Sequence, residues 1–171
     1  MDKIFQIRIG IPKPTPDHLK DYVQTLVEQV PDSVAKLFAE VLPKNPRSIK
    51  RILNLISYRQ NLLNSAHKKF SAIFWTLLED IIKNDMIILT CDRLGTQGSS
   101  IGYLINKIGD WNQIKDIFRN VVHGDIPDKH ASKLSKFFSI SHSITTEFKI
   151  TKDVLDEDFK ILYSATNEAL K

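Results

Sequence analysis

Apolar residues that recur every three or four positions are the feature that most constrains how this chain can fold. This spacing is typical of amphipathic helices, and it returns in one segment after another between prolines, which cannot continue a helix interior. The pattern predicts helices over residues 17–30, 33–42, 46–65, 70–82, 101–108, 111–123, 128–138 and 153–170. The predicted fold class is therefore mainly α, a multi-helix bundle.

Three segments depart from this helical pattern. Lys3–Ile9 reads KIFQIRI, and its branched, partly alternating residues predict one short N-terminal strand. Met86–Thr90 is apolar but too short to distinguish a helix end from a strand. Arg93–Ser100 contains glycines and serines, which predict a loop.

Cysteine and histidine usage excludes several classes of site. The one cysteine, Cys91, rules out an internal disulfide and a cysteine-rich zinc site, and its position after an apolar run favours a buried thiol over a nucleophile. The five histidines show no metal-ligand spacing with cysteine or acidic residues, so we expect no metal site. No apolar stretch is long enough for a membrane span or for the core of a secretory signal, so we expect neither. We therefore expect a reduced, cytoplasmic protein.

Positive charge is concentrated in one part of the chain. Residues 42–77 hold seven Lys or Arg and no Asp or Glu, while the whole chain carries a net charge of +4. A basic block of this kind favours an anionic partner, either a nucleotide phosphate or a nucleic acid. The alternative interpretation is a solvated helix face.

The helix that is predicted to start at Pro46 places cations where they are disfavoured. The amino end of a helix carries a partial positive charge, yet Arg47, Lys50 and Arg51 all lie in its first six residues, with no acid among them. An anion bound at the helix start would explain their position, and we take these three residues as candidate phosphate ligands. Alternatively, the long side chains simply extend into solvent.

A family resemblance covers residues 2–64. DKIFQIRIGIPKPTPDHLKDYVQTLV followed by NPRSIKRILNLI resembles the last core strand and helical lid of KAP-family P-loop NTPases, relatives of AAA-type ATPases. The resemblance implies a division into residues 1–65, the final strand and lid helices, and residues 66–171, a C-terminal helical bundle. It also implies that Arg47 senses the terminal phosphate of the nucleotide, with Lys50 and Arg51 in support.

The motifs that hold the nucleotide in such enzymes are missing from this chain. It contains no GxxxxGK[ST] sequence and no apolar strand ending in a magnesium-binding aspartate. We therefore expect a non-catalytic lid or regulatory segment that binds no cofactor alone. ATP and Mg²⁺ would come with a complete P-loop core, either missing from this sequence or on a separate polypeptide.

A second resemblance lies nearer the carboxyl end. Arg119-Asn120-Val121-Val122-His123 is similar to the Arg-Asn…His signature of HEPN-type helical domains, although three residues separate Arg119 from His123 instead of the usual four to six. This resemblance implies a homodimeric ribonuclease of a defence or toxin–antitoxin system, with RNA as partner. His123 would manage the 2′-hydroxyl proton and Arg119 would neutralise the phosphate. A plain protein-interaction module is the third alternative.

Overall fold

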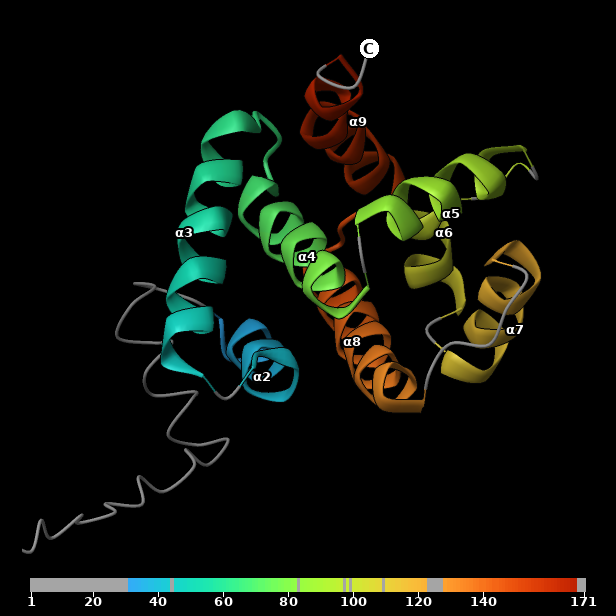
Figure 1. Ribbon diagram of the computed structural model, residues 1–171, viewed down its shortest axis with the longest axis horizontal. Helices are drawn as coiled ribbons and strands as arrows, with labels where there is room; N and C mark the ends of the chain where they lie inside the picture. Colours follow the sequence, from blue (N-terminus) through green and yellow to red (C-terminus); the bar gives the residue numbers. More distant parts are fainter. Residues whose placement is uncertain are drawn as a thin grey trace, which may run out of the picture.

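The computed structural model describes residues 31–168, apart from residues 44, 83, 97, 99, 109 and 123–127. This part of the chain forms a multi-helix bundle without strands (Figure 1). Its elements are α2 (Asp32–Val41), α3 (Pro46–Leu62), α4 (Lys68–Ile81), α5 (Asn84–Thr96), α6 (Ile101–Tyr103), the π-helical turn η1 (Leu104–Ile108), α7 (Trp111–Val122), α8 (Asp128–Glu147) and α9 (Lys152–Glu168). The predicted strand Lys3–Ile9 and the predicted helix over residues 17–30 lie outside the described residues.

Helix α4 occupies the middle of the bundle. It contacts α2, α3, α5, α8 and α9, and Figure 1 shows α3 on one side of it and α5 on the other. Around this centre, α2 packs on α8, α6 on α9, and α5 on α7. Side chains from both sides of the predicted domain boundary at residue 65 contribute to one hydrophobic core, and the boundary itself stays a prediction.

The sequence of α4 explains its central position. All residues from Phe70 to Leu78 are buried, because this stretch is apolar around most of the helix instead of along one stripe. Trp75 has no exposed surface; its ring lies 4.7 Å from the Phe159 ring centroid, and its Nε1 donates a hydrogen bond to the Leu155 carbonyl at 3.2 Å. Trp75 thus joins α4 to α9.

Apolar residues at helical spacing predict one buried side for α2 and one for α3, and polar residues predict an exposed opposite side for α3; these predictions are confirmed. The four apolar residues predicted for one side of α2 are all buried, namely Val34, Leu37, Phe38 and Val41. On α3, Ile49, Ile52 and Ile56 face the core. The opposite face is exposed, as predicted: Arg47, Lys50, Arg51, Asn54 and Tyr58.

Two segments are more helical than predicted. The segment at 86–90 belongs to α5, which continues to Thr96, so the predicted loop over Arg93–Ser100 is wrong for its first four residues. Ile87 and Leu94, seven residues apart, are both buried, and this packing outweighs the glycine at position 95. A turn follows at Gly98, whose φ of +71° suits glycine.

Helix α8 is also longer than its predicted range of 128–138 and ends only at Glu147. The added turns bury Ile144 against the core. Their hydroxyl-bearing residues, which usually weaken a helix, donate to backbone carbonyls of the same helix: Ser143 to Ser139, and Thr146 to His142 at 2.9 Å.

The short helix α6 approaches α9 closely at Gly102. A β-carbon at this position would lie 2.8 Å from the Lys152 carbonyl oxygen and 2.8 Å from Asp156 Oδ1. Only glycine fits without displacing backbone, so the α6–α9 contact depends on it. Within the described ranges, none of the helices combines the length and apolar character needed to cross a bilayer.

Candidate functional site

The first turn of α3 is built by Asn45 and Pro46. Asn45 has an extended backbone (φ −112°, ψ 116°), and its Oδ1 accepts a hydrogen bond from the Arg47 backbone N–H at 3.0 Å. Pro46 occupies the first helical position, where its missing N–H costs nothing. This cap and the proline define where α3 begins, and therefore the position of the cations in its first two turns.

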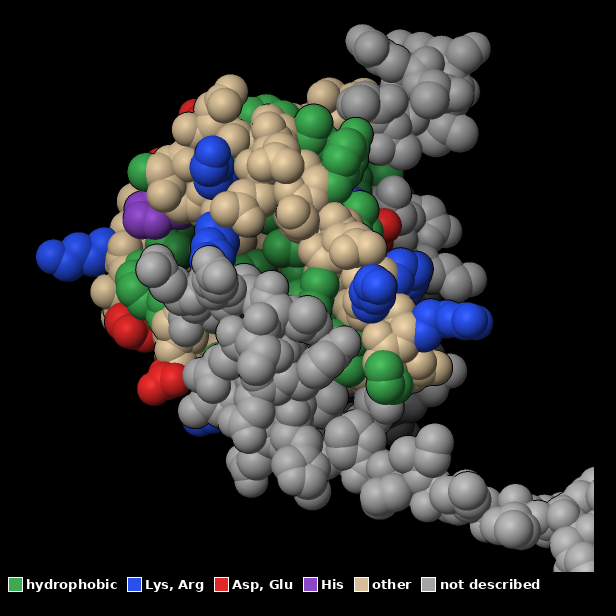
Figure 2. Space-filling model, turned by 90° about the vertical axis from the view of Figure 1, so that its left-hand side faces the viewer, with side chains coloured by type: hydrophobic (Ala, Val, Ile, Leu, Met, Phe, Trp, Pro, Cys, Tyr) green, Lys and Arg blue, Asp and Glu red, His purple; other side chains and the backbone are tan. Residues whose placement is uncertain are grey.

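Three cations follow on one surface of this helix start. Arg47, Lys50 and Arg51 are spaced by three and four residues, so their side chains leave the helix next to one another, and all three are exposed. The first turn of α3 contains no acidic residue. Figure 2 looks onto the side of the molecule where α3 lies, and Lys and Arg side chains project from several places on it.

An anion at this position would be held by side chains more than by the backbone. Pro46 has no N–H, and the N–H of Arg47 is already bonded to Asn45. The helix start therefore offers fewer free backbone donors than an uncapped one. Among the described residues at this helix start, the guanidinium of Arg47 and the ammonium of Lys50 are exposed and can bind a phosphate.

Arg51 differs from the other two cations because it has a carboxylate partner. Its Nη2 lies 3.3 Å from Asp80 Oδ1 on α4, although 73% of the Arg51 side chain remains exposed. Beside this pair is a hollow of about 80 Å³ that also touches Thr76 and Glu79. The hollow is too small for a nucleotide, and its two carboxylates would repel a phosphate.

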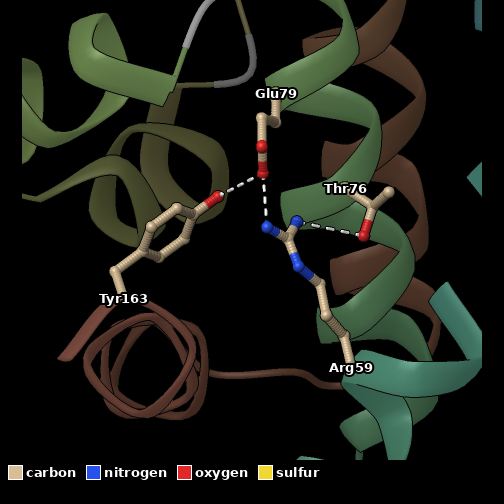
Figure 3. Close-up of polar contacts among 4 residues, drawn as sticks. All are labelled: Arg59, Thr76, Glu79 and Tyr163. Atoms are coloured by element: carbon tan, nitrogen blue, oxygen red, sulfur yellow. Dashed lines mark hydrogen bonds and ion pairs between the residues drawn. The ribbon is translucent and has the colours of Figure 1, made fainter. Parts of the chain in front are cut away.

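A buried polar cluster that was not predicted from the sequence lies further along the interface between α3 and α4. Arg59 of α3 is 8% exposed; its Nη1 donates to Thr76 Oγ1 at 3.2 Å and its Nη2 forms an ion pair with Glu79 (Figure 3). The hydroxyl of Tyr163, on α9, donates to the same Glu79 oxygen at 3.2 Å. Three helices therefore meet at one carboxylate.

This cluster has a structural role. The guanidinium of Arg59 lies 5.4 Å from the Tyr163 ring centroid, a cation–π arrangement. Burial raises the pKa of Tyr163, Arg59 lowers it and Glu79 raises it further, and the net direction is upward. The phenol is therefore neutral at physiological pH, and we assign the cluster to joining α3, α4 and α9.

A signal for the buried arginine was present in the sequence. Arg59 follows Ile49, Ile52 and Ile56 at helical spacing, so it falls on the apolar face of α3. A cation on such a face needs an acidic partner, and Glu79 follows the most apolar segment of the chain. The partner could be suspected, but not assigned, without the packing of α3 on α4.

The second candidate site is only partly within the described residues. Arg119 and Asn120 lie near the end of α7, and both are exposed. His123 falls outside the described residues, so the structure does not place it relative to Arg119. The arginine and asparagine are thus accessible to a phosphate group.

The lone cysteine faces a cavity of about 340 Å³ among α5, α6 and α9. The polar residues at this cavity include Asp92, Ser100, Asp156 and Lys160. Burial, together with the nearby carboxylates of Asp156 and Asp92, raises the pKa of the Cys91 thiol to about 12. Cys91 is therefore a protonated, weakly nucleophilic thiol.

The residues that the structure describes include no group of three or more His, Cys, Asp or Glu placed to hold a metal ion.

The raised pKa of Cys91 predicts slow alkylation. At pH 8, iodoacetamide should modify the folded chain about 10³-fold more slowly than a free cysteine, because the thiolate is the reacting species. Since Cys91 is the only cysteine, total incorporation measured by mass spectrometry reports this site alone. The chain unfolded in guanidinium chloride is the control and should react at the ordinary rate. A folded-state rate within about tenfold of free cysteine would contradict a partly buried, protonated thiol.

Comparisons of this chain with models of known protein families, with curated proteins and with solved structures find no match.

Proposed function

We propose that this chain is the non-catalytic lid and regulatory segment of a KAP-like P-loop NTPase. The nucleotide would be held by a P-loop core outside this chain, and Arg47 would contact its terminal phosphate. The observation that supports this most is the start of α3, where Arg47 and Lys50 are exposed next to each other in a region of the helix without acidic residues. The phosphate-binding role that the resemblance implies for these residues agrees with their exposure to solvent.

The geometry suggests that the three cations would contribute unequally to binding the phosphate. Arg47 stands at the helix end, and its planar guanidinium can bind two phosphate oxygens at once. Lys50, one turn further, adds a second positive charge on the same surface. Arg51 is the least available of the three because Asp80 already neutralises part of its charge. Arg47 is therefore the principal ligand in this proposal, and Lys50 supports it.

The lid role also accounts for the absence of catalytic parts. Phosphoryl transfer needs a phosphate cradle, a bound Mg²⁺ and a positioned nucleophile, and the sequence lacks the first two motifs. A lid arginine contributes by binding the negatively charged terminal phosphate of a nucleotide that the core holds. Nucleotide binding on the core would then draw α3, and the helices packed on it, towards the active site.

The first test adds tripolyphosphate, as the probe, to the ¹⁵N-labelled chain alone. Binding is measured from the NMR spectrum of the protein. We expect weak, roughly millimolar binding that shifts the resonances around Arg47 and Lys50 and is lost in Arg47→Gln. Arg51→Gln should weaken binding less, and Lys36→Gln, a change at an exposed lysine of α2, should leave it unchanged. Equal effects of Arg47→Gln and Lys36→Gln would contradict a specific role for Arg47.

The second test needs the core. DNA that precedes codon 1, or an adjoining gene, should encode GxxxxGK[ST], and ATP turnover by the reconstituted protein should fall about 10²-fold or more in Arg47→Gln. Turnover of ATP by this chain alone would contradict the proposal.

The exposed Arg119 and Asn120 keep a ribonuclease as the second candidate. RNA cleavage by this chain alone, abolished by His123→Ala, would favour that candidate instead.

A further inference from the structure

The solvent-facing side of α3 carries one continuous stripe of exposed residues, which we call the α3 stripe. Its members follow one another at spacings of three or four along the helix, so their side chains leave it on the same side: Arg47, Lys50, Arg51, Asn54, Tyr58 and Asn61. At about 1.5 Å per residue, the stripe is about 21 Å long. Helix α3 lies at one edge of the bundle in Figure 1 and packs on α4 and α9. The stripe is therefore an accessible surface that can contact several groups of an extended ligand.

The charge of the α3 stripe is complementary to a polyanion. Arg47, Lys50 and Arg51 are cations on successive turns, and the sequence from residue 42 to residue 77 holds no Asp or Glu. Asp80 of α4 pairs with Arg51, yet the Arg51 side chain is 73% exposed. A guanidinium has five N–H donors, so Arg51 can bind a second anionic group while it keeps Asp80. Several cations along one helix face favour a ligand with several phosphates.

Beyond the cations, the α3 stripe carries groups that can recognise nucleic-acid bases. Tyr58 is 61% exposed, and accessible aromatic rings stack on unpaired bases. Asn54 lies between the cations and Tyr58, and Asn61 follows one turn later. A side-chain amide both donates and accepts hydrogen bonds, as base edges do. Cations for phosphates beside an aromatic ring for bases are the combination that binds single strands.

We propose that the α3 stripe binds single-stranded nucleic acid. Arg47 and Lys50 would contact phosphates, and the Tyr58 ring would stack on a base. A duplex fits less well, because its bases already stack on one another and leave no free face for the ring. The proposal shares Arg47 and Lys50 with the lid function, but it requires neither a P-loop core nor a nucleotide and does not depend on that function.

The packing of α3 disfavours an anionic membrane surface as the partner. A helix that binds a bilayer inserts its apolar side at the level of the lipid head groups. The apolar side of α3, with Ile49, Ile52 and Ile56, is buried in the bundle and cannot be inserted. Tyr58 and Leu62 are exposed, but two side chains bury little apolar area. Charge and stacking therefore favour a nucleic acid over a lipid surface.

Fluorescence anisotropy with the full-length chain tests the proposal. The probe is a labelled single-stranded RNA of mixed sequence and about 15 nucleotides, with the same strand as DNA and the annealed duplex as further arms. We expect a Kd of about 10⁻⁵ M, and an affinity that falls about tenfold between 50 and 200 mM salt as two or three phosphates are neutralised. Binding of either single strand supports the proposal, and the RNA–DNA difference measures the contribution of the 2′-hydroxyl. No binding, or tighter binding to the duplex or to phosphatidylserine vesicles, would overturn it.

Variants of Tyr58 test the stacking contact. Tyr58→Ala should weaken binding of the single-stranded RNA about tenfold, whereas Tyr58→Phe keeps the ring and should stay within about twofold. Tyr103→Ala is the matched control, because Tyr103 is 40% exposed but belongs to α6, and it should leave the affinity within about twofold. Equal losses in Tyr58→Ala and Tyr103→Ala would overturn the proposed contact.

The same variants separate this proposal from the lid function. Tyr58→Ala should leave tripolyphosphate binding unchanged, because the ring contacts a base, whereas Arg47→Gln should weaken the binding of both ligands. An RNA affinity that is unchanged in Arg47→Gln would overturn the phosphate contacts of the α3 stripe. Tripolyphosphate binding without RNA binding would overturn this inference and leave the lid function standing. RNA binding without tripolyphosphate binding would support this inference and contradict the lid function.

Discussion

Replacing Trp75 with alanine should lower the free energy of unfolding by about 3–5 kcal/mol, the range for truncating a large buried aromatic side chain. The substitution removes ring contacts with Phe74 and Phe159 and leaves a cavity between α4 and α9. Because domains are stable by only about 5–15 kcal/mol in total, this variant should be close to unfolded at 37 °C. Urea unfolding followed by far-UV circular dichroism measures the loss.

Two further variants separate the causes of this loss. Trp75→Phe keeps an aromatic ring but removes the donor to the Leu155 carbonyl, and it should cost about 1–3 kcal/mol. Tyr58→Ala truncates an aromatic side chain that is 61% exposed, and its effect should stay within about 0.5 kcal/mol. A loss below about 1.5 kcal/mol for Trp75→Ala would contradict the central position of α4 in the core.

Replacing Arg59 with methionine should cost about 2–3 kcal/mol, somewhat less than the full cost of breaking a buried ion pair. Methionine keeps the apolar stem but removes the donors to Thr76 and Glu79. Glu79 would then retain the Tyr163 hydroxyl, and because its side chain is 25% exposed, water can replace part of the lost interaction. Urea unfolding of the variant measures the difference.

Arg51→Met is the matched control for this prediction. Both arginines lie on α3 and both pair with a carboxylate of α4, but the Arg51 side chain is 73% exposed and that of Arg59 is 10% exposed. The Arg51 variant should lose less than about 0.5 kcal/mol, because solvent and salt screen an exposed pair. A double-mutant cycle of Arg59→Met with Glu79→Gln should give a coupling energy of about 1 kcal/mol or more. Equal losses for the two arginine variants would show that burial does not distinguish these pairs.

These two arginines illustrate how much of the candidate site could be predicted. The cation-rich start of α3 was visible in the sequence, because a cap, a proline and the following residues lie within one helical turn. The roles of Arg51 and Arg59 were not, since their carboxylate partners lie 29 and 20 residues away along the chain. Sequence separation of this size says nothing about which side chains meet until α3 packs on α4.

The same distinction holds for the helices. The apolar faces of α2 and α3 agree with the prediction because each contains a regular stripe within one uninterrupted segment. Helix α5 includes the segment left ambiguous between a helix end and a strand and the first part of a predicted loop, and α8 extends beyond its predicted end. The reason is that buried positions lie in stretches that locally favour a loop, Leu94 next to a glycine and Ile144 among hydroxyl-bearing residues. Contacts with other helices stabilise these turns, and such contacts leave no local pattern in the sequence.

The sequence by itself determined that this chain is helical, which side of its main helices is apolar, and that positive charge gathers at the start of α3. Those properties follow from residue spacing of three to four positions and from the preferences of single residues. Only the tertiary structure decided that Arg59 is buried while Arg47 is exposed, and that a cavity opens beside Cys91. Burial and cavities arise between helices that are distant in sequence, so their physical origin is packing.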